Sequence, residues 1–474
     1  MVQAEGRAGL NPCFIRSCLL FHSGHSSYSW FLPLLNVMEI FLSEHTGDCQ
    51  VGGLVHLILN SDWQMKTIGI QFAAALVLLG AASTVWSEDK PLPARVDLSA
   101  EFDKLALPPR AQGDRDVCSL FAITGLANFE YARSQPESHT QLSEEFLIWA
   151  ARKATGKKDD QAMFYEAACG LNRLGICADR LMPYAKTADA HRQPSAQALA
   201  DAHRLTERWK VEWIKRWDLK NPLSDRQIHE LKQALANHHP VACGMRWPKN
   251  DKDGHQLLKV LPANEVEDGH SILVTGYVDD HKANGGGKFL FRNSWGPGWG
   301  HQGYGEMSFG YARAYTNDAL WMHFGSEGSE APTWHYEAEA LPVVARQNCE
   351  TTPQKMKDFR GPMWSGGAQL FCGAGDKGFV DLGFDVTKPG RYRVCVQATA
   401  APDFGIVRIG FPGAARAHEF DLYSGRVCPS GALELGAFDF TARRYVLRFT
   451  SIGKNRSSEG FAFGIDAIDL IALK

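Results

Sequence analysis

The stretch QGDRDVCSLFA, residues 112–122, decides the fold of the middle of the chain because it places a cysteine where a helix is predicted to begin. Its apolar residues continue at helical spacing through Leu126 and Phe129, so the predicted helix starts near Cys118. At a helix start, the unpaired backbone N–H groups and the positive end of the helix dipole stabilise a thiolate. Cys118 therefore has the surroundings of a nucleophile, although the same pattern is also typical of a small core residue.

Two further stretches carry groups that can work with a thiolate. DGHSILVTGY, residues 268–277, sets His270 at the head of an apolar β-like run, where its imidazole can pair with the thiolate and protonate a leaving amine. KFLFRNSWG, residues 288–296, is a predicted strand that delivers Asn293, whose amide oxygen can fix the orientation of the imidazole. Trp295 is predicted to shield that hydrogen bond from water and so to support the site.

In their order and spacing, these three stretches resemble the papain family of cysteine peptidases. The resemblance rests on the Gln-Gly pair six positions before Cys118, the Gly-His strand and the Asn-Ser-Trp-Gly segment, and it covers roughly residues 95–324. It implies an α+β, two-lobed fold with a helical lobe and a β-barrel lobe. It also implies four roles: Cys118 as nucleophile, His270 as general acid/base, Asn293 as its orienter, and Gln112 with the Cys118 backbone N–H as the oxyanion hole.

The nucleophile segment departs from the family pattern. The family's Cys-Gly-Ser-Cys-Trp is RDVCS here, residues 115–119, so the first disulfide cysteine and the Trp after the nucleophile are both absent. The family's Cys-Asn-Gly-Gly segment, which lines the substrate cleft, has no counterpart near DDQ, residues 159–161, so the family's substrate preference does not carry over. Residues 93–97 already resemble a mature amino terminus, so no long inhibitory propeptide is expected.

An export signal is predicted at residues 65–87. Residues 68–82 are almost uninterrupted apolar sequence behind Met65, and small residues and a charged run follow them, which is the layout of a secretory signal peptide. The apolar core is shorter than the roughly 20 residues that cross a bilayer as a helix, so no stable membrane span is expected. We interpret residues 1–64 as a gene-model extension upstream of the initiator Met65. The mature protein is expected to be secreted, periplasmic or at the cell surface.

Export would permit disulfide bonds. Four cysteines in the C-terminal region allow two bridges in three pairings: Cys349, Cys372, Cys395 and Cys428. Cys169–Cys177 is a further pairing that the sequence permits. No cysteine pair has the close spacing of a zinc site, and the neighbouring His238 and His239 have no evident third ligand, so neither a metal nor a cofactor is predicted.

The C-terminal region is predicted to be a linker, residues 325–334, followed by an all-β sandwich, residues 335–474. The linker is rich in Gly, Ser, Glu and Pro. Beyond it, apolar runs of strand length recur between turns without helical patterns: Phe379–Val386, Tyr392–Ala398, Ile406–Phe411, Tyr445–Phe449 and Ile465–Ala472.

Three segments of this region are similar to galactose-binding-like, carbohydrate-binding sandwich modules: YEAE (residues 336–339), KPGRY (388–392) and GIDAI (464–468). The similarity implies a carbohydrate or cell-surface ligand. Three aromatic residues could stack on sugar faces if they are exposed, and are otherwise core or turn residues: Trp364, Phe404 and Tyr423.

The composition is that of an ordinary globular protein, with 50 Lys+Arg against 53 Asp+Glu and 45% hydrophobic residues. This balance argues against a basic nucleic-acid binder and against a disordered chain. The sequence therefore predicts an exported cysteine peptidase, with its peptidase domain at residues 88–324, that hydrolyses peptide bonds through a thioester intermediate. Two alternatives stay open: a catalytically inactive papain-fold binding or adhesion protein, and an acyltransferase that uses the same acyl-enzyme.

Overall fold

The computed structural model describes residues 91–474 except 139, 207, 251–253, 281, 283–284, 326–332, 360–362, 415 and 474. The predicted export signal, the extension upstream of it and most of the predicted linker lie outside the described residues. Within the described part, no helix combines the length and the apolar character needed to cross a membrane. Residues Asp89–Lys474 form one compact unit, which contains two regions with separate cores.

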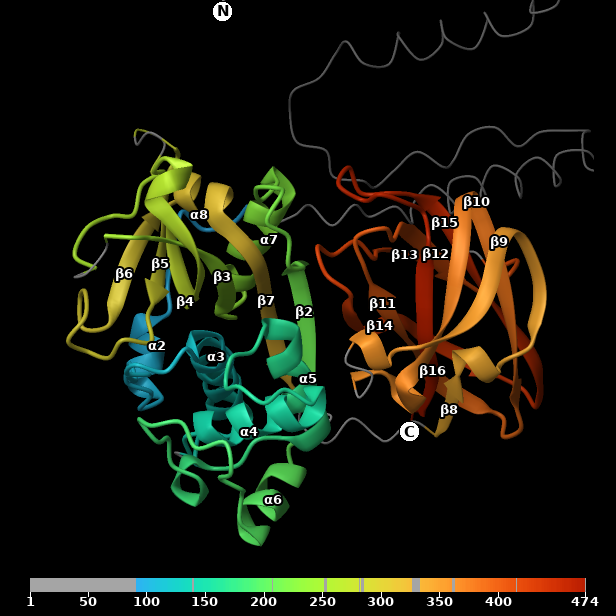
Figure 1. Ribbon diagram of the computed structural model, residues 1–474, viewed down its shortest axis with the longest axis horizontal. Helices are drawn as coiled ribbons and strands as arrows, with labels where there is room; N and C mark the ends of the chain where they lie inside the picture. The colour runs from blue at the N-terminus through green and yellow to red at the C-terminus, as the bar shows by residue number, and fades with distance from the viewer. Residues whose placement is uncertain are drawn as a thin grey trace, which may run out of the picture. The chain divides into compact units, whose positions relative to one another are not determined.

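The first region is built on a seven-stranded antiparallel sheet in the order β2-β7-β3-β4-β5-β6, with β1 paired to β4 (Figure 1). Its strands are β1 Arg95–Asp97, β2 Trp209–Lys215, β3 Val241–Pro248, β4 Val266–Asp279, β5 Gly287–Arg292, β6 Tyr304–Ser308 and β7 Thr316–Phe324. Along β5, buried and half-buried side chains alternate because successive side chains of a strand point to opposite faces. The strands predicted behind His270 and before Asn293 are β4 and β5.

Seven α-helices accompany this sheet: α2 Ser99–Lys104, α3 Cys118–Ser134, α4 Glu144–Thr155, α5 Phe164–Leu174, α6 Ala196–His203, α7 Asp225–Ala236 and α8 Phe309–Tyr315, among the described residues. Two short 3₁₀ helices lie between them, η2 Asp179–Leu181 and η3 Ala263–Glu265. α4 begins where the Ser143 hydroxyl accepts the Phe146 backbone N–H at 2.9 Å, and it ends at Gly156 in the left-handed conformation.

The helix α3 is the centre of the first region. Most of its side chains are buried, and it packs against β4 and β7 on one side and against α4 and α5 on another. In Figure 1, α3 lies between the strands and the helices α4 and α5. A single apolar core joins Leu120 and Ile123 of α3 to Ile272 of β4 and Leu320 of β7. Burial of such side chains contributes roughly 1.5–3 kcal/mol each, so the start of α3 is firmly placed.

The second region is all β. Its strands are β8 Trp334–Glu337, β9 Val343–Lys355, β10 Ala368–Val386, β11 Gly390–Ala400, β12 Ile406–Gly410, β13 Ala417–Asp421, β14 Cys428–Phe440, β15 Arg443–Gly453 and β16 Phe463–Ala472. They are joined by 3₁₀ helices at η4 Ala338–Ala340, η5 Lys357–Phe359 and η7 Ser365–Gly367. All five strands predicted from the sequence are present, whereas β8, β9, β13 and β14 were not predicted.

The strands of this region pair antiparallel in the order β13-β12-β15-β10-β16-β11-β14, with β8 on β16 and β9 on β10. The long strand β10 has two partners on the same side, because Leu370–Cys372 pairs with β16 and Phe379–Val386 pairs with β15. The strand-rich C-terminal domain is thus confirmed. The closure of its sheets into a galactose-binding-like sandwich stays a prediction.

The three aromatic residues considered for sugar stacking are buried. Trp364 is 2% exposed, Phe404 3% and Tyr423 7%. The indole N–H of Trp364 donates to the Thr399 hydroxyl at 2.8 Å, so even its polar edge is satisfied inside the protein. The stacking hypothesis for these residues is therefore wrong, and they are core residues.

All eight cysteines that the structure describes are free. The pairing Cys169–Cys177 is absent because the two side chains pack in different clusters, Cys177 with Phe146 and Cys169 against Tyr165. Among the C-terminal cysteines, Cys349 and Cys372 lie on the neighbouring strands β9 and β10, but neither they nor the other two form a bridge. No disulfide is formed among the described cysteines, but the thiols of Cys349 and Cys372 interact, so the pairings expected in the C-terminal region stay predictions.

Candidate active site

Cys118 is the first residue of α3, as the sequence predicts. Its side chain is half-buried, and its Sγ lies 3.6 Å from the Gly269 carbonyl oxygen, to which a thiol can donate. Burial raises the pKa of the Cys118 thiol, and hydrogen bonds from the backbone and hydroxyl of Ser271 oppose that shift without cancelling it. This shift favours the thiol over the thiolate at Cys118, which lies beside Gly269 of β4.

His270 and Asn293 meet because β4 and β5 are antiparallel neighbours. β5 ends opposite Leu273, so the chain returns Asn293 to the head of β4. His270 Nε2 lies 2.8 Å from Asn293 Oδ1, and the Ser294 backbone N–H donates to the same oxygen at 2.8 Å. Since that oxygen is an acceptor in both bonds, His270 Nε2 carries the hydrogen and Nδ1 carries the lone pair in the neutral ring.

The imidazole is also held neutral. Burial lowers the pKa of His270 to about 4, and the hydrogen bond with Asn293 opposes this only in part. Cys118 meets the residues on either side of His270, Gly269 and Ser271, rather than the ring itself. Burial thus favours the neutral form of each group, and the thiolate–imidazolium pair expected from the sequence stays a prediction.

Two tryptophans contact the imidazole ring, and a third packs against both of them. The Trp295 ring centroid lies 4.6 Å from that of His270 and tilted by 32°, while Trp247 lies at 4.6 Å edge-on. Trp299 packs against both tryptophans. The sequence analysis missed Trp247, because it lies on β3 and reaches His270 only through the β3–β4 register, which pairs Met245 with His270.

Gln112 links the nucleophile segment to the Asn293 segment. Its side-chain nitrogen donates to the Arg115 carbonyl at 2.7 Å, and its side-chain oxygen accepts from the Ser294 hydroxyl at 2.6 Å. Its backbone N–H donates to the Ser294 carbonyl, and its own carbonyl accepts from the Tyr184 hydroxyl at 2.6 Å. Because an amide nitrogen carries two hydrogens, one remains for an oxyanion.

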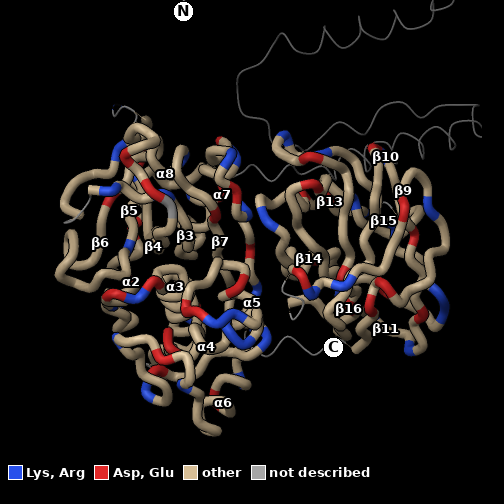
Figure 2. Tube along the Cα trace, viewed as in Figure 1, with Lys and Arg blue, Asp and Glu red and all other residues tan. Residues whose placement is uncertain are grey.

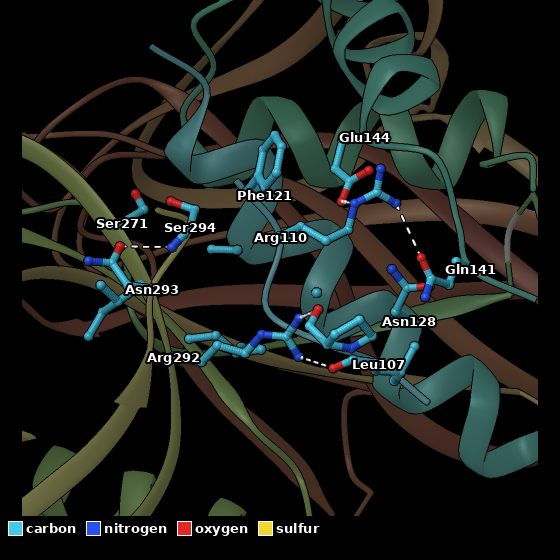
Figure 3. Close-up of a pocket in the computed structure, with 15 residues that line it drawn as sticks. Leu107, Arg110, Phe121, Asn128, Gln141, Glu144, Ser271, Arg292, Asn293 and Ser294 are labelled. Carbon is cyan, nitrogen blue, oxygen red and sulfur yellow. Dashed lines mark hydrogen bonds and ion pairs between the residues drawn. The ribbon is translucent and has the colours of Figure 1, made fainter. Parts of the chain in front are cut away.

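A cavity of about 40 Å³, lined by both apolar and polar side chains, lies between α3 and the Asn293 segment (Figure 3). That volume holds roughly two or three waters. Glu144, 3% exposed, faces it with its Oε1 3.2 Å from Arg110 Nε, and burial raises the pKa of its carboxyl to about 7. Within the described part of the chain, Glu144 Oε2 and Asn293 Nδ2 are both buried without a hydrogen-bond partner.

No group of three or more His, Cys, Asp or Glu side chains that could hold a metal ion is found among the described residues. His239, one of the two adjacent histidines considered from the sequence, instead pairs with Glu130 at 2.8 Å.

Comparison with known proteins agrees with this geometry. The family model described as "Papain family cysteine protease" matches residues 92–319, just under half of the chain. Residues 92–319 are a papain-family cysteine protease domain. The protein therefore carries a papain-like cysteine-type peptidase, which confirms the enzyme class predicted from the motifs.

The relatives of this protease domain are distant. An uncharacterized peptidase C1-like protein of Acanthamoeba polyphaga mimivirus is 22% identical over 46% of this chain and 71% of its own length. A cysteine protease of Blomia tropicalis is 24% identical over 43% of this chain, and the match spans only 57% of that relative. Among solved structures, xylellain, a cysteine protease from Xylella fastidiosa, is 25% identical with a TM-score of 0.41, covering 49% of this chain and 87% of its own.

Proposed function

We propose that the protease domain hydrolyses peptide bonds with Cys118 as nucleophile, His270 as general acid and base, and Asn293 as the residue that orients His270. The observation that carries the proposal is the 2.8 Å contact between His270 Nε2 and Asn293 Oδ1, with the Cys118 thiol against the neighbouring Gly269 carbonyl. Gln112 and the Cys118 backbone N–H would bind the oxyanion, and Trp295 would keep water from the His270–Asn293 bond.

The reaction begins when the Cys118 proton moves to Nδ1 of His270, which the Nε2–Asn293 bond leaves with a lone pair. The thiolate attacks the carbon of the scissile carbonyl. The oxyanion that forms accepts a hydrogen bond from the second N–H of the Gln112 side-chain amide. Imidazolium then protonates the departing amine as the C–N bond breaks, which leaves a thioester. Water attacks the thioester while His270 takes its proton, and the Cys118 thiol is regenerated with release of the acid.

The same proposal includes the finer points of the architecture and location. We propose that the protease domain spans residues 88–324 in two lobes, one helical and one a β-barrel, with the substrate between them. Residues 335–474 would form a separate sandwich after a linker, and residues 65–87 would direct export to the outside of the cell or to the periplasm. Trp364, Phe404 and Tyr423 are buried, so they cannot supply the aromatic surface on which a carbohydrate would stack.

The test is cleavage of a mixed fluorogenic peptide library by the full chain under reducing conditions. Cys118→Ala should lose at least about a thousandfold in kcat/KM, because the nucleophile has no substitute. Cys169→Ala is the matched control, since Cys169 is the other half-buried free thiol of the described protease domain and lies in a different cluster. Its rate should equal that of the wild type.

The same experiment separates the alternatives. Folded wild-type protein without turnover would favour the binding or adhesion protein. Turnover whose product masses show transfer to an added amine in preference to water would favour the acyltransferase.

A further inference from the structure

Three of the residues that depart from the papain-family pattern bond to one neighbouring segment. Arg115 stands in place of the family's first disulfide cysteine, and Ser119 in place of its tryptophan. Together with Asp116, they contact three consecutive residues of the segment 159–162. The contacts, in order, are Arg115 Nη2 to Asp160 Oδ2 at 2.6 Å, Gln161 Nε2 to Asp116 Oδ2 at 3.2 Å, and Ser119 Oγ to the Ala162 carbonyl at 2.5 Å.

Arg115 makes the strongest of these contacts because its guanidinium is enclosed and both of its terminal nitrogens are hydrogen-bonded. The residue is 7% exposed, and its Nη1 also donates to Glu145 Oε2 at 2.7 Å and to the Ala185 carbonyl at 2.5 Å. The guanidinium carbon, Cζ, lies 5.0 Å from the centroid of the Tyr184 ring. A planar guanidinium can hold several fixed acceptors at once, which a lysine ammonium cannot do with the same geometry.

The two carboxylates that bind Arg115, Asp160 and Glu145, also interact with other arginines. Arg152 donates to the second oxygen of Asp160 at 2.9 Å, and Arg192 lies 3.8 Å from Glu145. Glu145 and Arg152 belong to α4, and Figure 2 shows Lys and Arg interspersed with Asp and Glu around α4 and α5. Asp160 therefore has one cation from the nucleophile segment and one from α4, a difference that an experiment can exploit.

The backbone of Arg115 connects this cluster to the reacting groups. Its carbonyl oxygen accepts the Gln112 side-chain amide at 2.7 Å and the Val117 backbone N–H at 2.9 Å, immediately before Cys118 begins α3. The side chain thus fixes Arg115 to α4 and to the segment 159–162, while the carbonyl fixes the amide that would bind the oxyanion. A displacement at Arg115 would move Gln112 and the turn into Cys118 together.

We propose that Arg115 is a positioning residue for Gln112 and Cys118, and that its ion pairs are a non-covalent tether between the nucleophile segment and the segment 159–162. The role of Gln112 in this inference rests on the proposed function, whereas the tether itself does not. Because no thiol takes part in the tether, the alignment of the site should be independent of disulfide redox state.

The test compares Arg115→Gln with Arg152→Gln in the full chain. Both variants remove one cation from Asp160, but only the first alters the nucleophile segment. Arg115→Gln should lower kcat about 10- to 100-fold with KM within about threefold, because a misplaced oxyanion donor acts in the transition state. Alkylation of Cys118 by iodoacetamide needs no oxyanion donor, so it responds only to the displacement of Cys118 and should fall by a clearly smaller factor than kcat. Arg152→Gln should change all three quantities by less than about threefold.

Two further measurements keep the outcome decisive. Arg115→Lys retains the charge but loses the fork geometry of the guanidinium. Compared with Arg115→Gln, it should restore the melting temperature more fully than it restores kcat. Hydrogen exchange of residues 157–163 should be faster in Arg115→Gln than in Arg152→Gln. Equal losses of kcat in the two glutamine variants, or a parallel loss of kcat and alkylation rate, would overturn the positioning role. If the wild type has no turnover, the proposed function fails, and equal exchange rates in the two variants would then refute the tether separately.

Discussion

The two halves of the candidate active site are held in place by different forces. The nucleophile half, residues 112–119, is fixed by charged and polar contacts, with Arg115 bonded to Asp160 and Glu145. In the base half, His270 is buried between the rings of Trp247 and Trp295, and its hydrogen bond with Asn293 lies in that water-poor environment. The geometry of the nucleophile half therefore depends on ion pairs, whereas the protonation of His270 in the base half depends on the exclusion of water.

This difference predicts two kinds of failure. Loosening the base half admits water to His270 and so changes its protonation, because burial is what lowers the pKa of its imidazole to about 4. Loosening the nucleophile half displaces Gln112 and Cys118 but leaves the surroundings of the imidazole unchanged. The pH dependence of kcat/KM should therefore separate damage to one half from damage to the other.

The largest effect on the pH profile is expected for Trp247→Leu. The wild type should show a bell-shaped profile, with an acid limb near pH 4 where His270 gains a proton and an alkaline limb above the ordinary thiol pKa where Cys118 loses its own. Opening the imidazole to water should raise its pKa toward the ordinary 6.5. At pH 5.5 the variant should then retain about a tenth of the wild-type kcat/KM, because protonated His270 cannot accept the thiol proton.

Trp149→Leu is the control for that experiment, because Trp149 packs against Phe146 on α4 rather than against His270. It should leave both limbs in place. A folded Trp247→Leu protein whose acid limb stays near pH 4 would show that the aromatic rings do not set the protonation of His270.

An intermediate effect is expected for Glu144→Gln, at the cavity where the two halves meet. The carboxyl pKa is raised from 4.5 to about 7, so between these values the folded state binds more protons than the unfolded state. The stability contributed by this group is present below pH 4.5 and is lost as the pH rises through 7. Between pH 5 and pH 8, ionisation of Glu144 should lower the wild-type free energy of unfolding by up to about 3 kcal/mol. The Glu144→Gln variant should lack this part of the pH dependence.

Urea unfolding at the two pH values measures that difference, with the exposed Glu137→Gln as control. The pKa values of Asp318 and Asp466 are also raised to about 7 by burial, so the wild type alone would not isolate Glu144. An identical pH dependence in Glu144→Gln and wild type would mean that Glu144 stays charged in the folded protein, balanced by Arg110.

The sequence predicted the reacting groups better than the groups that hold them. Cys118, His270 and Asn293 lie in short motifs, and each motif falls at the end of a helix or strand whose apolar pattern is visible. Trp247 and Arg115 act through contacts made across strands or across loops distant in sequence, which no local pattern encodes. The partners of Arg115 lie 30 to 70 positions away along the chain.

The C-terminal domain gives the same lesson in a weaker form. β10 and β16 were predicted because their apolar residues recur at strand length, but β9 exposes almost every side chain and so has no alternating pattern to detect. Trp364 was considered for ligand binding because an exposed aromatic ring can stack on a sugar face, yet the Thr399 hydroxyl and the surrounding core enclose it. Local turn chemistry indicates a loop and does not indicate which way its side chains point.

The smallest effect is expected for Ser119→Ala, and it gives the sharpest contrast with Trp247→Leu. The change removes the hydrogen bond from Ser119 Oγ to the Ala162 carbonyl, worth about 1 kcal/mol, while Arg115 and Asp116 keep their contacts with the same segment. The value of kcat/KM should fall about two- to fivefold across the whole pH range with both limbs unmoved, because geometry changes and the burial of His270 does not. A shifted acid limb in Ser119→Ala would show that the two halves are coupled, and the division between a charge-held and a burial-held half would then fail.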